Sequence, residues 1–437
     1  MNISPELVGW IAVVTLFAML GLGVPVAFTL TGIGFFGYLI LAGSGPSLGM
    51  VGLVPYAKTA LYAFTAVPLF IAMGNLAFYA GFGSDLYDAA RKWVGRFPGG
   101  LAQATVVGGA AFGAACGSGL AGCAMLTKIA VPEMIRHGYD KRLAIGCAGS
   151  AGPIAQMIPP SIMFVLYGII TEQSVAKLLI AGIIPGIICA IIYMITIYIW
   201  VRINPKIAPE PERVPWKEAF ISVKKVWGVA ILALIVMGGI YSGVFTPTEA
   251  AGVGAFGTLI LGLVARRIAK KNLSEAFLDT AKSTSMLYLI LAGAYIFGYL
   301  LAITKLPFQL ADFLSTLPVS RYVILFLVMI FYIIIGCLID MVPAMFVTLP
   351  MIFPTIMRLE FNPIWFGVLV VQLGEISLLT PPFGLNLFLM KGLMPEVEMD
   401  DIIRGVFPFI IAAIFTLFVY IIFPQTSLFL PNLMMGK

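Results

Sequence analysis

Two stretches decide the fold of this chain, PEMIRHGYDKRLAIGCAGSAGPIAQMIPP at residues 132–160 and PTIMRLEFNPIWFGVLVVQLGEISLLTPP at residues 354–382. They align without gaps at an offset of 222 residues, and the same offset carries Pro25 onto Pro247 and Gly32 onto Gly254. The offset indicates an internal repeat. The identical pairs are Pro132 with Pro354, Arg136 with Arg358, Gly152 with Gly374, Ile154 with Ile376, Pro159 with Pro381 and Pro160 with Pro382.

The composition excludes a water-soluble fold. Of the 437 residues, 61% are hydrophobic and 11% are charged, whereas soluble domains carry about 25% charged residues. The mean hydropathy is +1.04. At about 20 residues per crossing, the length allows roughly ten to twelve membrane segments. Apolar segments lie at about 5–22, 24–42, 64–82, 141–175, 178–201, 229–245, 248–265, 284–303, 362–394 and 404–423.

Two further apolar stretches, 99–135 and 321–357, are interrupted near their middles. The first breaks at Gly117-Ser118-Gly119 and the second at Asp340, ahead of Met341-Val342-Pro343. Each is either two crossings or a hairpin that enters and leaves the membrane on one side. The distribution of lysine and arginine distinguishes these readings, because such residues concentrate in cytoplasmic loops.

Basic residues gather at 202–228 and 266–282, which two apolar segments separate, so both stretches face the cytoplasm. Residues 83–98 then also face the cytoplasm. The basic link between Arg136 and Arg142 faces the cytoplasm as well only if the stretch 99–135 returns to the side of the membrane from which it entered. We therefore predict two re-entrant hairpins, the first entering from the cytoplasm and the second from outside.

The predicted fold is an all-α polytopic membrane protein, an inverted-topology repeat with about ten transmembrane helices and two re-entrant helical hairpins. Secondary transporters built from inverted repeats place their binding sites near the midplane of the membrane, at broken helices. The first repeat spans 1–215, with scaffold helices at 5–82, an arm helix at 83–98, a hairpin at 99–135 and a broken helix at 141–175. The second spans 223–437, with scaffold helices at 229–303, an arm helix at 305–320, a hairpin at 321–357 and a broken helix at 362–394.

The hairpin breaks carry the first candidate site residues. At Gly117, Ser118 and Gly119, glycine exposes backbone carbonyls and serine adds a hydroxyl, which are the oxygen ligands that sodium prefers; a tight small-residue helix contact is the alternative. Asp340 lies deep in an apolar stretch, where a carboxylate is costly and usually functional. A structural ion pair or a helix cap is the alternative for Asp340.

Paired prolines break two long apolar segments at matched positions, Pro159-Pro160 and Pro381-Pro382. Proline removes an amide donor and frees upstream carbonyls, which in a bilayer must find another partner. A plain kink is the alternative. We expect sodium near Gly117, Ser118, Gly119, Asp340, Thr380 and Pro381, and substrate near Ser118, Pro159, Pro160, Ser161 and Asn386.

Two glutamates have less certain roles. Glu249 follows Thr246-Pro247-Thr248, in the first turn of an expected helix, where a structural cap is the favoured interpretation. Glu375 lies within an apolar segment, and its role stays open.

Other classes of protein receive little support. The five cysteines lie in apolar stretches without a CxxC pair, and the single histidine, His137, excludes a metal or haem site built mainly from histidines. No GxxxxGK[ST] motif is present, which argues against direct drive by ATP. We expect no enzymatic activity, no nucleic-acid partner, no cofactor and no metal other than sodium as a coupling ion.

The chain resembles the DctM-like large membrane subunit of tripartite ATP-independent periplasmic (TRAP) transporters over nearly its whole length. The resemblance is carried by long motifs in both halves. They are Val67-Pro68-Leu69-Phe70, Phe112-Gly113 through Ser118, Val131-Pro132-Glu133-Met134, Ile158-Pro159-Pro160-Ser161, Gly243 through Ala250, and Leu379 through Asn386.

The resemblance implies a sodium-coupled importer of small organic acids in the bacterial inner membrane, with the elevator motion of the ion-transporter superfamily. It also implies a periplasmic substrate-binding protein and a small four-helix, DctQ-like membrane subunit, expected here as a separate chain in the same bilayer. The chain departs from the family at Gly119-Leu120-Ala121-Gly122, where relatives usually carry hydroxyl residues. A stand-alone sodium/anion symporter of the same architecture, without a binding protein, remains the alternative.

Overall fold

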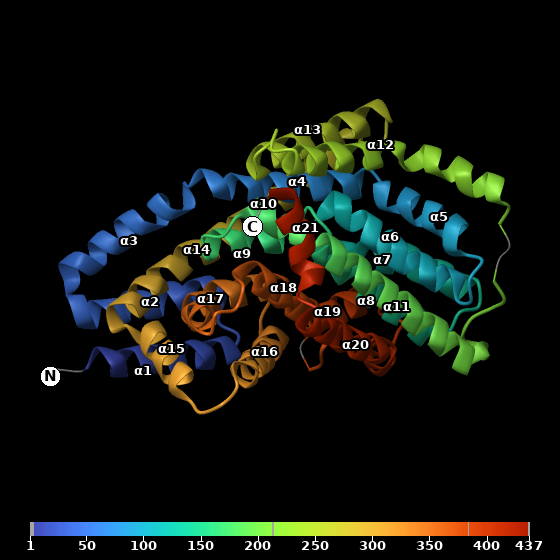
Figure 1. The fold of residues 1–437 in the computed structure, drawn as a ribbon. Helices are drawn as coiled ribbons and strands as arrows, with labels where there is room; N and C mark the ends of the chain where they lie inside the picture. Colours follow the sequence, from blue (N-terminus) through green and yellow to red (C-terminus); the bar gives the residue numbers. More distant parts are fainter. Residues whose placement is uncertain (1–3, 212–213, 383, 436–437) are drawn as a thin grey trace.

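The computed structural model describes residues 4–211, 214–382 and 384–435 (Figure 1). Regular secondary structure in these ranges is entirely helical. The α-helices are α1 Pro5–Gly21, α2 Val26–Ala42, α3 Ser44–Thr59, α4 Ala66–Tyr79, α5 Phe82–Val94, α6 Gly100–Cys116, α7 Gly119–Arg136, α8 Lys141–Met157, α9 Ile162–Ile170, α10 Val175–Ala181, α11 Ile183–Ile203, α12 Trp216–Tyr241, α13 Pro247–Val264, α14 Lys270–Thr304, α15 Leu306–Thr316, α16 Arg321–Leu338, α17 Met341–Arg358, α18 Pro363–Leu379, α19 Leu385–Leu393, α20 Met399–Ile422 and α21 Gln425–Met435; short 3₁₀ helices span Tyr62–Thr65 and Pro205–Ile207.

The helices are long and apolar enough for a multi-pass membrane protein. Within the described residues, eight helical segments can cross a membrane by length and composition, or nine if the pair α8 and α9, bent by 45°, counts as one span. Four more apolar helices, α1, α2, α6 and α18, are 17 residues long. The all-α polytopic class predicted from the sequence is confirmed.

Several helix bounds differ from the apolar segments of the sequence. Helix α3 lies where no segment is predicted, because Ser44–Thr59 mixes glycine, proline and serine with its apolar residues. Helix α12 begins at Trp216 rather than near 229, because its first turns carry charged residues that lower the hydropathy. Those turns are held by the arm helix α5, whose Trp93 packs edge-on against Trp216 and Phe220. Helix α14 likewise begins at Lys270 rather than near 284.

Two broken helices form the centre of the molecule. Every residue of α8 from Leu143 to Met157 is buried, and so is every residue of α18 from Ile364 to Leu379. Around them, α8 packs against α6, α7 and α20, and α18 packs against α16 and α20. Helices that are far apart in sequence therefore lie side by side at the centre (Figure 1).

The remaining helices surround this centre. Helix α14 packs against α2, α3 and α4, and α13 packs against α4 and α12. Arm helix α5 packs between α6 and α12, whereas the corresponding helix α15 packs against α17. Each half thus places one short helix against its own helical hairpin, α6–α7 or α16–α17.

Candidate functional site

The tip of the first hairpin is a tight turn between α6 and α7. Gly117 has a φ of +64°, a left-handed conformation that glycine adopts without steric cost. Ser118 caps α7, and its hydroxyl accepts a hydrogen bond from Ala121 N at 3.4 Å. A Cβ atom at position 117 would meet the carbonyl oxygen of Pro160, so only glycine lets the tip lie against the proline break.

The second hairpin turns at Asp340. Helix α16 ends at Leu338 and α17 begins at Met341. The Asp340 carboxylate accepts a hydrogen bond from Val342 N at 3.2 Å, which caps α17. The cap that the sequence left as an alternative is therefore present. It uses one carboxylate oxygen and leaves the charge available to a ligand.

The proline pairs separate α8 from α9 and α18 from α19, and both Pro–Pro peptide bonds are cis. Beyond the first pair, Ser161 is fully buried and accepts a hydrogen bond from Phe164 N at 3.3 Å, so it caps α9. Ile162 N donates to the carbonyl oxygen of Gly117 at 3.4 Å. Before the second pair, the Thr380 hydroxyl donates to the carbonyl oxygen of Ile376 at 2.6 Å.

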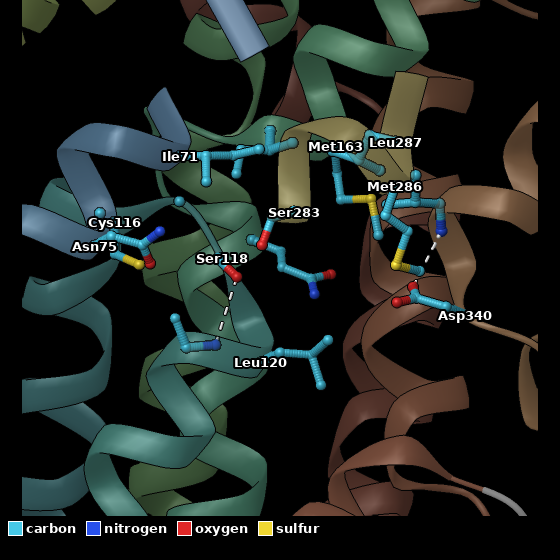
Figure 2. A pocket seen from close by; sticks show the side chains of 16 residues that line it. Ile71, Asn75, Cys116, Ser118, Leu120, Met163, Ser283, Met286, Leu287 and Asp340 are labelled. Carbon is cyan, nitrogen blue, oxygen red and sulfur yellow. Dashed lines mark hydrogen bonds between the residues drawn. The ribbon is translucent and has the colours of Figure 1, made fainter. Parts of the chain in front are cut away.

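A cavity of about 310 Å³ lies between the two hairpin tips. Figure 2 shows Ser118 and Asp340 on opposite sides of it. Three predicted sodium-site residues, Gly117, Ser118 and Asp340, line this cavity together, although Ser118 and Asp340 are 222 positions apart in the chain.

The other predicted site residues are placed elsewhere. Asn386 is fully buried in α19, and its side-chain amide donates to the carbonyl oxygen of Gly149 on α8 at 3.2 Å. The remaining predicted residues, Gly119, Pro159, Pro160, Ser161, Thr380 and Pro381, lie at the hairpin tip and the two helix breaks but do not line this cavity.

Three polar residues line the cavity that the sequence reasoning missed: Asn75 of α4, Gln156 of α8 and Ser283 of α14. Asn75 Nδ2 donates to Thr280 Oγ1 at 3.0 Å, a bond in which the side-chain oxygen of Asn75 takes no part. Gln156 is 5% exposed, and its Oε1 has no hydrogen-bond partner in the described part of the chain. Its position three residues before Pro159, in an otherwise apolar and small-residue segment, was the available signal.

Helix ends give this cavity its electrostatic character. The N-terminal turns of α7, α9 and α17 border it through Leu120, Met163 and Val342. First-turn amides lack intrahelical partners, and the N-terminus carries partial positive charge, which favours an anion. Helices α6 and α8 pack together and both end at the breaks, as do α16 and α18. Such C-terminal ends favour a cation.

Glu249 has the structural role that the sequence favours. Its carboxylate accepts hydrogen bonds from the backbone amide of Thr246 at 2.8 Å and from the Thr246 hydroxyl at 2.9 Å, and Glu249 N donates to that hydroxyl at 3.3 Å. This reciprocal pair is a capping box at the start of α13.

Residues 13–426 match the family described as tripartite ATP-independent periplasmic transporter, DctM component. The chain is 36% identical to the C4-dicarboxylate TRAP transporter large permease protein DctM of Pseudomonas aeruginosa, over 90% of this chain and 92% of that protein. It is 31% identical to the 2,3-diketo-L-gulonate TRAP transporter large permease protein YiaN of Escherichia coli, over 83% and 85%.

The fold is also similar to that of solved membrane transporters. The YdaH transporter of Alcanivorax borkumensis, described as having an unusual topology, superposes with a TM-score of 0.59 at 13% identity, covering 88% of this chain and 90% of that one. MtrF of Neisseria gonorrhoeae gives a TM-score of 0.57 at 13% identity, covering 87% and 85%. At this identity the likeness concerns the fold alone.

Proposed function

Because the chain belongs to the family of the DctM component of tripartite ATP-independent periplasmic transporters, we propose that this large permease couples sodium entry to the import of a small organic acid. The protein is a multi-pass inner-membrane transporter subunit and not an enzyme. The observation that carries the proposal is the cavity between the two hairpin tips, which Ser118 and Asp340 line from opposite sides.

Sodium binds at the helix breaks in this proposal. One site uses the tip residues Gly117, Ser118 and Gly119, against the C-terminal end of α8. The other uses Asp340 with Thr380 and Pro381, at the C-terminal end of α18. Converging helix C-termini supply partial negative charge for a cation, and the carboxylate supplies a full one. The broken backbone also supports the assignment, because non-helical backbone at membrane depth is tolerated where it lines a cavity or binding site.

The substrate occupies the cavity itself. No lysine or arginine belongs to the described residues that line it, so its carboxylate is held by the N-terminal turns of α7, α9 and α17 together with bound sodium. Ser118, Gln156, Asn75 and Ser283 supply neutral hydrogen-bonding groups. Four predicted substrate residues do not line the cavity: Pro159, Pro160, Ser161 and Asn386. In this proposal they hold the lining groups in place without touching the substrate.

We expect Gln156→Ala to raise the substrate concentration for half-maximal uptake by about fivefold, since one hydrogen bond contributes about 1 kcal/mol. The matched control is Gln103→Ala. Gln103 is also a buried glutamine, 3% exposed, but its amide donates to Met194 O at 2.9 Å, away from this cavity. An equal effect of both substitutions on half-maximal uptake would assign Gln156 to packing.

Two partners complete the transporter: a periplasmic substrate-binding protein and a separate small membrane subunit. The chain covers 92% of a relative named large permease, but 66% of the isethionate TRAP transporter permease protein DctMQ of Oleidesulfovibrio alaskensis. The competing function is a stand-alone sodium/anion symporter, which needs neither partner.

Uptake into proteoliposomes tests the proposal. The permease is reconstituted with the small subunit and the binding protein loaded with labelled substrate, under an inward sodium gradient or an equal potassium gradient. We expect uptake only with sodium and only with both partners present. Uptake without a sodium gradient would refute the coupling, and uptake by the permease alone would favour the symporter.

The motion proposed is an elevator. Helices α6–α11 and α16–α20 form a transport domain that moves against a scaffold of α1–α4 and α12–α14, with the arm helices α5 and α15 between them. The cavity is bordered from both sides, by Ile71 and Ser283 of the scaffold and by Ser118 and Asp340 of the transport domain, and this position supports a site that is carried past the scaffold.

A disulfide between the two domains is expected to stop transport. A Cβ atom at Gly74 of α4 would lie 2.9 Å from the sulfur of Cys116 of α6 and 2.9 Å from its backbone oxygen, so a cysteine at position 74 reaches a free native thiol once α4 and α6 shift slightly apart. Oxidation of Gly74→Cys should abolish uptake, and reduction should restore it. Gly74→Ser and the double variant Gly74→Cys, Cys116→Ser control for bulk and for oxidation elsewhere. Unchanged uptake by the cross-linked protein would exclude relative motion of α4 and α6.

A further inference from the structure

Glu375 is an acidic residue in the centre of the transport domain that the sodium and substrate sites do not use. It lies in α18, five positions before Thr380, and its exposed fraction is 0%. It does not line the cavity between the hairpin tips. A carboxylate at this depth of a membrane protein is costly and needs a partner.

The neighbours of Glu375 are neutral donors on two helices. Gln372 Nε2 donates to Glu375 Oε2 at 3.3 Å, and the thiol of Cys189 on α11 donates to the same oxygen at 3.6 Å. Gln372 is fully buried, as is Cys189. Glu375 Oε1 and Gln372 Oε1 have no hydrogen-bond partner among the described residues.

No positive charge compensates Glu375 in the described structure. The titratable side chains that interact with it are Cys189 and Tyr193 of α11 and Tyr420 of α20, all fully buried and uncharged at neutral pH. Most charged side chains on the surrounding helices bond elsewhere: Arg142 with Asp401, Arg404 with Asp400, Arg358 with Asp312, Arg202 with Tyr198, Arg321 with Leu359 O, Lys391 with Pro395 O and Val397 O, and Asp340 with Val342 N. The other two, Lys141 of α8 and Lys177 of α10, lie in the first turns of their helices, where Lys141 is exposed and Lys177 half-buried.

A proton on Glu375 removes the uncompensated charge and supplies a hydrogen-bond donor. An ionised Glu375 would be an unpaired charge among neutral groups, which is far more costly than a neutral carboxylic acid in the same place. A protonated carboxyl offers one O–H donor. The side-chain oxygen of Gln372 has no donor in the described structure. The amide of Gln372 can also be turned over, so that its oxygen and nitrogen exchange places. With this amide turned over, the O–H of Glu375 donates to the oxygen of Gln372, in place of the amide-to-carboxylate bond at 3.3 Å. Protonation therefore removes the charge while a hydrogen bond still joins the two side chains.

We infer that Glu375 is a proton-binding site inside the transport domain, separate from the sodium sites, and that its carboxyl stays neutral while the domain moves. The protonation follows from the geometry alone, whereas its consequence for transport rests on the proposed function. A neutral Glu375 removes one negative charge from the moving domain, so the membrane potential does not act on this side chain. Loss of the proton at alkaline pH would leave a buried unpaired charge and stop transport.

Infrared difference spectroscopy on the purified permease tests the protonation directly. The wild-type spectrum minus that of Glu375→Gln, at neutral pH, should contain the carbonyl band of a protonated carboxylic acid, shifted in D₂O. The Asp340→Asn difference identifies any band from the carboxylate at the second hairpin tip. A difference that contains only carboxylate bands would overturn the inference, whether or not the permease proves to be sodium-coupled.

Uptake as a function of pH tests the consequence. Glutamine resembles the neutral carboxylic acid in shape, so Glu375→Gln should keep at least about half of wild-type uptake at neutral pH, as expected for a substitution that leaves no unpaired charge. Wild-type uptake should fall as pH rises, and uptake by Glu375→Gln should not. Loss of uptake in a Glu375→Gln protein that melts at the wild-type temperature would overturn the inference, and so would an identical alkaline decline in both proteins.

Discussion

Asp340→Asn is expected to abolish sodium-coupled uptake while leaving the protein folded. Two unit charges 4 Å apart attract by about 4 kcal/mol at an effective dielectric constant near 20, so removal of the carboxylate should weaken sodium binding by up to about a thousandfold. The measurement is the sodium concentration for half-maximal uptake in proteoliposomes, together with the melting temperature of the purified permease.

Asparagine is the informative replacement because Asp340 also caps α17 through Val342 N. Asparagine and aspartate are about equally good N-caps, whereas alanine costs about 1 kcal/mol at such a position. Asp340→Asn therefore removes the charge and keeps the cap, and Asp340→Ala removes both. If Asp340 were only a cap, Asp340→Asn would transport like wild type and Asp340→Ala would lower the melting temperature.

Asp140 provides a matched control for this substitution. Its carboxylate caps α8 by accepting from Arg142 N at 2.8 Å, and it lies outside the cavity. Asp140→Asn should therefore leave the sodium dependence of uptake unchanged. A similar rise in the half-maximal sodium concentration for both variants would locate the effect in helix capping rather than in the hairpin tip.

The breaks of the hairpins were predictable because their chemistry is local. Glycines around Ser118 and a carboxylate at Asp340 interrupt apolar stretches, and the structure ends one helix and begins the next at both places. The offset between the halves matched these positions without any structural information. Their meeting at one cavity was an expectation from the repeat, and the two residues do line the same cavity.

The rest of the cavity depends on helix rotation, which single polar residues do not reveal. Asn75 and Ser283 lie on the scaffold helices α4 and α14, where a neutral amide or hydroxyl is as compatible with an outward face as with the cavity. Asn386 illustrates the converse, because it follows the break in sequence but bonds to Gly149 O of α8 and does not line the cavity. Helix α3 was missed for another reason, since its packing on α14 is a tertiary contact that hydropathy does not report.

The two halves resemble each other in architecture more than in chemistry. In the first, Arg91 of the arm pairs with Glu133 of the hairpin at 2.8 Å. In the second, the polarity is reversed, because Asp312 of the arm pairs with Arg358 of the hairpin. Each arm is thus tied to its own hairpin by an ion pair of opposite sense. The two hairpin tips also differ in charge, because Ser118 of the first corresponds to Asp340 of the second. The two proposed sodium sites should therefore differ in charge and affinity.

The largest expected effect on stability is at Gly146, where the halves touch backbone to backbone. A Cβ atom on Gly146 of α8 would meet the carbonyl oxygen of Gly405 of α20, and one on Gly405 would meet the carbonyl oxygen of Arg142. Small residues allow such close approach of helices in membranes. The ion pair between Arg142 and Asp401, at 2.7 Å, lies one turn away and depends on the same spacing.

Gly146→Ala should therefore force α8 and α20 apart and destabilise the permease by about 1–3 kcal/mol, the usual cost of overpacking, with a lower melting temperature and less folded protein in the membrane. Gly298→Ala is the control, because no atom lies within 4 Å of the added methyl group on α14. Alanine is favoured over glycine in a helix by about 1 kcal/mol, so this variant should melt at or above the wild-type temperature. Equal melting temperatures for the two variants would mean that α8 and α20 are not held at this distance, and the central contact between the two halves would have to be placed elsewhere.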